Sequence, residues 1–250
     1  MTSAFARSSS NVPHPASDTS LEIPSRPSWV ISRLTGAVAD IAVAAGRPLR
    51  AVDIGCGSGI VTSMTMAECE TRPGASLALV GMDLSGAAVH RAYQRGVLAV
   101  QASVEGRLPL ASASVDVVIM FELIEHLVDP DAALAEVRRV LVPGGHFLLT
   151  TPNLAAWFNR ALLLIGVQPL FSEVSTTSIY GRPGHDVVGH LRLFTRRALA
   201  EFLVASGFLD VSITGLPYHD VPRPLGPVDR LLCRVPSLAS IFFVSARVPE

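Results

Sequence analysis

The chain has 250 residues, of which 49% are hydrophobic and 16% charged, and its formal net charge is −1. This size fits one large α/β domain, and the near-neutral charge argues against a nucleic-acid partner, because such binding rests on neutralising phosphates. No run reaches the ~18 consecutive apolar residues of a transmembrane segment, and three cysteines without metal or disulfide spacing favour a cytoplasmic location.

The N-terminal stretch differs in composition from the rest of the chain. Residues 1–27 are rich in Ser, Pro and Thr and poor in large apolar side chains, which predicts a disordered tail. The domain is therefore expected to cover 28–250. It opens with a helix that Ser28 can cap and whose apolar residues recur at helical spacing as far as Ile41. A short apolar strand over 51–54 follows.

This strand leads directly into a turn with three glycines, Gly55, Gly57 and Gly59. Glycine permits a tight strand-to-helix turn, and a ligand can lie against the backbone because no Cβ intervenes. A dinucleotide-binding turn needs its third glycine three residues after the second, and Ile60 occupies that position. The spacing therefore makes a nicotinamide oxidoreductase the least favoured function.

Helices and strands alternate after this turn, and the second half of the chain is less regular. Helices are expected over 60–70, 85–95, 129–141, 154–165 and 195–206. Strands are expected over 77–83, 97–102, 115–120, 146–151, 209–214 and 241–248. The early alternation predicts an α/β fold with a doubly wound parallel sheet, which binds ligands at the carboxyl ends of its strands.

An acid followed by Gly-x-Gly-x-Gly, here Asp53 to Gly59, resembles motif I of the class I S-adenosylmethionine (SAM) methyltransferases. The resemblance implies that SAM is the cofactor and that Asp53 holds its methionine part. It also implies that residues 55–59 pass beneath the cofactor, so Gly55, Cys56, Gly57 and Gly59 belong to the predicted binding site.

The resemblance extends over about 48–215 and implies a fold. The alternating units and the two late strands match a Rossmann-like, seven-stranded, mostly parallel methyltransferase sheet. Residues 152–194 would then be an insertion after strand five. Its apolar residues, among them Trp157 and Phe171, are expected to form a lid over the acceptor.

Asp83 ends the second strand, 24 residues after Gly59, close to the offset of an acid that binds ribose hydroxyls. With motif I in place, we assign Asp83 and its neighbour Leu84 to cofactor binding; the alternative is an acid that only caps the next helix. Where the family commonly has an adenine-binding acid, this chain has Ser103, followed by Val104. Both are expected near adenine, and the missing acid predicts weaker cofactor binding.

Glu122, Glu125 and His126 form a Glu-x-x-Glu-His run just past the fourth strand, beside the expected methyl position. On a helix this spacing would place all three side chains on one face. Two carboxylates and an imidazole could bind a divalent cation that lowers the pKa of a substrate hydroxyl.

The same run resembles ubiquinone-biosynthesis O-methyltransferases and small-RNA 3′-terminal 2′-O-methyltransferases, where it supplies metal ligands. In the latter a further histidine lies downstream of a Thr-Pro-Asn; here these are residues 151–153 and His190. The predicted ligands of Mg²⁺ or another divalent cation are thus Glu122, Glu125, His126 and His190. A metal-free alternative stays open, in which His126 is the general base, because imidazole titrates near neutral pH.

These motifs together predict a SAM-dependent methyltransferase that acts on a hydroxyl oxygen of a small, partly apolar acceptor, such as a phenol, a sugar or a lipid-linked metabolite. Two alternatives remain. Methylation of a terminal RNA 2′-hydroxyl shares the Glu-x-x-Glu-His pattern but is opposed by the neutral charge, and a SAM-binding module without catalysis would share the cofactor motifs. The sequence carries no indication of the oligomeric state.

Overall fold

The computed structural model describes residues 29–184, 187–218 and 221–250. They form a seven-stranded sheet with strand order β3-β2-β1-β4-β5-β7-β6. Strand β7 is antiparallel to both of its neighbours, and the other paired strands are parallel. The predicted Rossmann-like, mostly parallel methyltransferase sheet is therefore confirmed. The predicted tail over 1–27 lies outside the described residues.

The strands are β1 Leu49–Ile54, β2 Leu77–Asp83, β3 Ala99–Gln101, β4 Val115–Phe121, β5 Leu141–Pro152, β6 Leu209–Leu216 and β7 Ile241–Arg247. The α-helices are α1 Trp29–Ala45, α2 Ile60–Thr71, α3 Gly86–Gln94, α4 Pro130–Val140, α5 Trp157–Leu164, α6 Arg196–Ala205 and α7 Gly226–Leu232. Single 3₁₀ turns cover η1 Ile124–His126, η2 Arg223–Leu225 and η3 Pro236–Leu238. None of the helices within the described ranges is long and apolar enough to cross a membrane.

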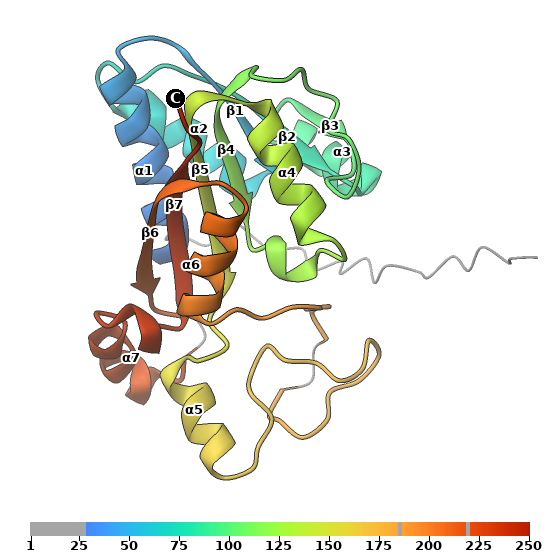
Figure 1. Ribbon diagram of the computed structural model, residues 1–250, viewed down its shortest axis with the longest axis vertical. Coiled ribbons are helices and arrows are strands. Elements are labelled where there is room, and N and C mark those ends of the chain that lie inside the picture. Colours follow the sequence, from blue (N-terminus) through green and yellow to red (C-terminus); the bar gives the residue numbers. More distant parts are fainter. Residues whose placement is uncertain (1–28, 185–186, 219–220) are drawn as a thin grey trace, which may run out of the picture.

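Helices cover both faces of the sheet (Figure 1). One apolar core lies between the sheet and α1 with α2, and a second lies between the sheet and α4 with α6. The central strand β4 contributes to both cores, and its residues Val115–Met120 are all buried. Burial on both faces explains why this strand has an almost unbroken apolar sequence instead of an alternating one.

Strand β5 begins five residues earlier than the sequence pattern predicts. Leu141 pairs with Val115 and His146 pairs with Val117, so four residues on β5 face a single residue on β4. The Pro-Gly-Gly at 143–145 therefore forms an irregularity within the strand rather than a loop before it, as Gly and Pro commonly do at bulges.

Helix α7 was not expected from the sequence. Gly226 and Pro227 suggest a loop, yet Pro227 occupies the first turn of the helix, where its missing N–H costs no hydrogen bond. Helices α5 and α7 lie beyond the carboxyl ends of the parallel strands, at the bottom of Figure 1. They are joined there by a hydrogen bond of 2.8 Å from Trp157 Nε1 to Asp229 Oδ1.

Candidate active site

The glycine turn lies between β1 and α2 and is tied to the neighbouring strand β2. The amides of Gly55 and Cys56 both donate to the carbonyl of Met82, at 2.7 and 2.9 Å. Gly55, Gly57 and Gly59 have φ values of 77°, 54° and 77°, a left-handed conformation that glycine adopts without steric cost. Glycine is therefore favoured at all three positions, because each of them adopts this conformation.

The three glycines serve different purposes. A Cβ on Gly59 would lie 2.8 Å from Ala92 Cβ, and a Cβ on Gly55 would lie 2.8 Å from Leu123 Cδ2. At Gly57, no described atom lies within 4 Å of that position. Gly55 and Gly59 are therefore needed for packing, whereas Gly57 borders open space in which a cofactor can approach the backbone.

Cys56 is buried within this turn, and burial raises the pKa of its thiol to about 12. A thiol with so high a pKa is neutral at physiological pH and a poor nucleophile. Its neighbour across the sheet is Gly81, where a Cβ would come within 2.7 Å of Cys56 Sγ. Cys56 thus fills the space beneath the turn and is not a reactive group.

Asp83 lies at the carboxyl end of β2, beside the turn. Its Oδ2 accepts a hydrogen bond of 2.8 Å from the Gly57 amide, and its Oδ1 accepts one of 2.8 Å from the Ser85 amide. Each carboxylate oxygen has a second lone pair, and the side chain is only partly buried. Asp83 can therefore shape the turn and still accept ribose hydroxyls, and the adjacent Leu84 exposes 56% of its surface beside it.

Asp53 is buried beneath the same turn with an incomplete set of partners. Thr62 Oγ1 donates to Asp53 Oδ2 at 2.6 Å, while Oδ1 is buried and has no hydrogen-bond partner among the described residues. Burial raises the pKa of this carboxyl to about 6. A buried carboxylate oxygen without a partner is costly, and it fits the ammonium group of a SAM methionine moiety.

Ser103 and Val104 follow β3, where the resemblance places adenine. The Ser103 hydroxyl accepts a hydrogen bond of 3.2 Å from the Glu105 amide, and Val104 is buried. The carboxylate of Glu105, the nearest acid, accepts instead from the Val128 amide. One oxygen of Glu105 is thus engaged by the chain itself, and the adenine contact of Ser103 and Val104 stays a prediction.

On the acceptor side, the Glu-x-x-Glu-His run is not an α-helix. Glu122 has a left-handed φ of 46°, and only the 3₁₀ turn η1 follows it. The helical face that would hold Glu122, Glu125 and His126 together is therefore not formed. Instead the Glu122 amide donates to the carbonyl and hydroxyl oxygens of Thr150 on β5, at 3.2 and 3.1 Å, and so continues the pairing of β4 with β5.

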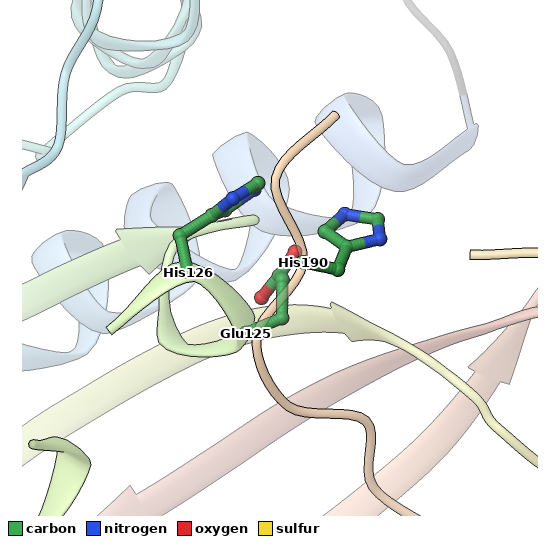
Figure 2. Close-up of side chains that lie close together, drawn as sticks. All are labelled: Glu125, His126 and His190. Atoms are coloured by element: carbon green, nitrogen blue, oxygen red, sulfur yellow. The ribbon is translucent and has the colours of Figure 1, made fainter. Parts of the chain in front are cut away.

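Three of the four predicted ligands nevertheless come together. One donor atom from each of Glu125, His126 and His190 lies within 4.8 Å of the others. Figure 2 shows Glu125 and His126 entering from η1 and His190 from the loop after α5. Glu122 does not belong to this group, which we call the Glu-His-His cluster.

The two glutamates are buried close together. Glu125 is fully buried; its Oε2 accepts a hydrogen bond of 2.9 Å from Thr151 Oγ1, and its Oε1 has no partner among the described residues. Burial and the nearby Glu122 charge raise the pKa of Glu125 well above its usual range, and burial also raises the pKa of Glu122. These shifts favour the neutral form of Glu125, and a cation bound in the cluster would favour its ionised form.

Each histidine of the cluster is oriented by a backbone carbonyl. His126 Nδ1 lies 3.1 Å from the Gly189 oxygen, and His190 Nδ1 lies 2.9 Å from the Phe171 oxygen. A carbonyl oxygen only accepts, so both Nδ1 atoms carry protons, and in the neutral rings Nε2 holds the lone pair. Burial lowers the pKa of His190, so this ring is neutral at pH 7 and can accept a proton or ligate a metal.

Several residues of the site were not singled out from the sequence. Thr150, next to the noted Thr-Pro-Asn at 151–153, holds Glu122. Gly189 orients His126, and Phe171, expected only as a lid residue, orients His190. The buried Glu173 accepts from the amides of Val188 and Gly189 at 2.7 and 2.8 Å. No local pattern could have marked the loop residues, because their partners lie far away in the sequence. His185, five residues before His190, lies outside the described residues.

Comparisons with known proteins agree with this geometry. The family model described as "Methyltransferase domain" matches residues 52–149. A ubiquinone biosynthesis O-methyltransferase of Pectobacterium atrosepticum is 30% identical over 177 residues, covering 68% of this chain and 66% of the relative. A probable S-adenosylmethionine-dependent methyltransferase of Mycolicibacterium smegmatis is 37% identical over 110 residues, covering 44% and 39%.

The matched part thus spans about two thirds of the first of these relatives and less of the second. Among solved structures, a SAM-dependent methyltransferase from Archaeoglobus fulgidus superposes with a TM-score of 0.57 at 16% identity, covering 87% of this chain and 92% of that one. This likeness concerns the fold. Taken with the sequence relatives and the glycine turn, it leads to one conclusion: the chain belongs to the class I SAM-dependent methyltransferases.

Proposed function

We propose that this methyltransferase transfers the methyl group of SAM to a hydroxyl oxygen of a small, partly apolar acceptor. The observation that carries the proposal is the Glu-His-His cluster beside the cofactor turn. Leu123, two residues before Glu125, packs where Gly55 lacks a side chain. Proton-accepting groups therefore lie next to the edge at which the cofactor would bind. The O-methyltransferase relative supports a hydroxyl acceptor.

The chemistry requires deprotonation and alignment. In the transfer, the O–CH₃ bond forms as the S–CH₃ bond breaks, and the acceptor O–H proton must leave. Nε2 of His126 or His190 is the group that takes it, because Nδ1 of each ring is already protonated and bound to a carbonyl. An in-line displacement of this kind gains chiefly from alignment and from exclusion of water.

The 152–194 insertion would supply that exclusion. Trp157, Phe158 and Phe171 form a continuous set of edge contacts, with ring centroids 5.6 Å apart for the first pair and 6.2 Å for the second. Phe171 also lies 6.0 Å from the His190 ring. This aromatic wall adjoins the cluster and favours an acceptor with an apolar portion, which supports a phenolic or lipid-linked compound over a sugar.

A divalent cation would fit the Glu-His-His cluster. Two imidazoles and one carboxylate suit Mn²⁺, Fe²⁺ or Zn²⁺ better than Mg²⁺, which prefers oxygen ligands. When bound, such an ion would lower the pKa of an acceptor hydroxyl. Glu125 would then be ionised, and the Nε2 atoms of both histidines would ligate the metal instead of acting as bases.

The proposal is tested first by calorimetric titration of S-adenosylhomocysteine, the product of the cofactor, into the protein. Saturable binding in the wild type and its loss in Asp83→Ala establish the cofactor site. A panel of phenols, sugars and lipid-linked alcohols is then assayed for methyl transfer, with a short RNA carrying a free 3′ end as one further acceptor.

The outcomes of these assays distinguish the candidate functions. Turnover of a phenol or lipid-linked alcohol supports the proposal, and turnover of the RNA alone replaces it with terminal 2′-O-methylation. Binding of S-adenosylhomocysteine without turnover of any acceptor supports a non-catalytic SAM-binding module. If S-adenosylhomocysteine does not bind at all, the proposed function is wrong.

A further inference from the structure

Phe171 has an unusual backbone conformation at the edge of the cluster. Its φ is 71°, and only Ala113, Glu122 and Asp210 share a positive φ among the described residues other than glycine. A bulky side chain in this region is a true outlier that costs free energy. Such strain persists only where the surroundings impose it, and it concentrates at functional sites.

The surroundings of Phe171 hold it from two directions. Its ring makes edge contacts with Tyr218, at a centroid distance of 5.1 Å, and with Phe158, at 6.2 Å. Both neighbours are in turn tied to the buried carboxylate of Asp229. This carboxylate accepts a hydrogen bond of 3.0 Å from the Tyr218 amide. It accepts another of 2.8 Å from the indole of Trp157, the residue before Phe158. The strained residue is therefore fixed by α5, α7 and the segment after β6.

The strained backbone of Phe171 bears on the position of its carbonyl oxygen. Phe171 O accepts the proton of His190 Nδ1 at 2.9 Å. A return of Phe171 to a negative φ would rotate its carbonyl away from the imidazole. The ring contact between Phe171 and His190, 6.0 Å between centroids, would change with it. One residue thus controls both the orientation of His190 and the nitrogen that carries its proton.

We propose that Phe171 is a positioning residue for His190, whose strained backbone keeps the proton on Nδ1 and the lone pair on Nε2. His190 Nε2 is then available to the Glu-His-His cluster in every molecule. Without this constraint the two neutral tautomers compete, and a fraction of the protein presents an N–H where a lone pair is needed. The effect on turnover rests on the proposed function; the tautomer itself does not.

The test is the tautomer of His190, measured by nuclear magnetic resonance on protein with ¹⁵N-labelled histidine at pH 7.5, where His190 is neutral. The His190→Asn spectrum assigns the signal. We expect Nδ1–H in the wild type and a mixture, or Nε2–H, in Phe171→Leu, which removes the ring contacts that hold the backbone while the left-handed φ stays unfavourable. Asp210→Ala, at another left-handed position with φ 52°, is the control and should leave the tautomer unchanged.

Kinetics give the second measurement. With an accepted substrate, Phe171→Leu should lower kcat about tenfold, in the range typical for groups that orient a functional histidine, while S-adenosylhomocysteine affinity stays within about twofold of the wild type. Phe171→Gly is the second variant. Glycine adopts a positive φ without strain, so the carbonyl can stay beside His190, and the tautomer should change less than in Phe171→Leu.

Two results would overturn the inference: Nε2–H on His190 in the wild type, or the wild-type tautomer fully retained in Phe171→Leu. If instead S-adenosylhomocysteine fails to bind the wild type while the tautomer behaves as expected, the proposed function fails and the positioning role stands.

Discussion

The amide of Gly57 donates to the carboxylate of Asp83 at 2.8 Å, so the turn after β1 is fastened to the end of β2. The two strands are neighbours in the sheet, with Asp53 level with Gly81. The acid expected to bind ribose therefore also sets the conformation of the backbone expected to lie beneath the cofactor. One carboxylate links two parts of the cofactor site that are 26 residues apart in the sequence.

This link predicts that Asp83→Ala loses cofactor binding by more than a single contact. The variant removes the ribose acceptor and leaves the Gly57 and Ser85 amides without their partner. We expect S-adenosylhomocysteine affinity to fall at least ~30-fold, or about 2 kcal/mol, measured by calorimetry. Asp129→Ala is the matched control, because Asp129 also accepts a backbone amide, Ala132, but at the start of α4. It should cost about 1 kcal/mol of stability and leave binding unchanged.

The glycine turn predicts that alanine at Gly57 chiefly weakens ligand binding, whereas alanine at Gly59 chiefly lowers the stability of the fold. Gly57→Ala places a methyl group in the open space and should weaken S-adenosylhomocysteine binding, with only ~1 kcal/mol lost in the free energy of unfolding from the positive φ. Gly59→Ala adds a contact of 2.8 Å with Ala92 and should cost ~3 kcal/mol or more. Urea unfolding and calorimetry separate the two, and equal losses of stability would contradict the assignment of Gly57 to the ligand side.

The raised pKa of Asp53 predicts a dependence on pH. Its pKa is about 6 in the folded protein, against an ordinary value of 3.8, so the folded state binds the proton more tightly. The free energy of unfolding should therefore fall as pH rises from about 4 to 6. Asp53→Asn removes this titration, and at pH 8 it should be more stable than the wild type by about 3 kcal/mol.

The same substitution should weaken S-adenosylhomocysteine binding at pH 8, because the amide cannot pair with the ligand's ammonium group. The wild-type affinity should rise between pH 5 and pH 8 as Asp53 ionises, and the affinity of Asp53→Asn should change little. A variant that is no more stable than the wild type at pH 8 would show that Asp53 has a partner when the cofactor is absent.

The Glu-His-His cluster predicts that a transition-metal ion binds with a stoichiometry of one. Mn²⁺ should bind the wild type and not His190→Asn, as measured by electron paramagnetic resonance. Chelation should lower turnover, and Mn²⁺ should restore it. His90→Asn, at an exposed histidine on α3, is the control and should bind normally. Full turnover in the presence of EDTA would select the metal-free route, in which His126 or His190 is the base.

On the cofactor side, the sequence allowed the glycine turn and the strand ends to be placed, and the binding roles of their residues stay predictions. The determinants are local: an acid, three glycines at fixed spacing, and an acid at the end of the next strand. Each of these residues acts through its own backbone conformation or through the adjacent strand. The parallel sheet followed from the alternation of apolar segments, because strands buried on both faces cannot alternate apolar and polar residues.

On the acceptor side, the sequence pointed to some of the residues but not to their arrangement. The resemblance pointed to Glu125, His126 and His190, yet Glu122 has a left-handed φ and its amide binds Thr150, a residue of β5 that only the folded sheet brings near. Phe171 was expected only as an apolar residue of the lid. Its proposed role in orienting His190 belongs to its backbone carbonyl. Every residue has a carbonyl, so the residue type does not indicate this role.

Glu173 shapes the loop that carries Gly189 and His190. Its buried carboxylate accepts from the Val188 and Gly189 amides and pairs with Arg182 at 3.4 Å, and both side chains of this ion pair are buried. Glu173→Gln keeps the size but provides only one acceptor oxygen, so one amide and the guanidinium lose a charged partner. Breaking a buried pair in this way costs ~3 kcal/mol or more.

Because Glu173 lies within the loop and not in the sheet, the cost should appear locally. We expect faster proteolysis between 166 and 194, a lower kcat from a displaced Gly189 carbonyl, and nearly unchanged S-adenosylhomocysteine affinity. Glu201→Gln is the control: it breaks the exposed pair with Arg197, which is worth at most ~0.5 kcal/mol. If Glu173→Gln lowered the stability of the whole domain and the loop resisted protease, the loop would be part of the global folding unit and not a separately anchored cover.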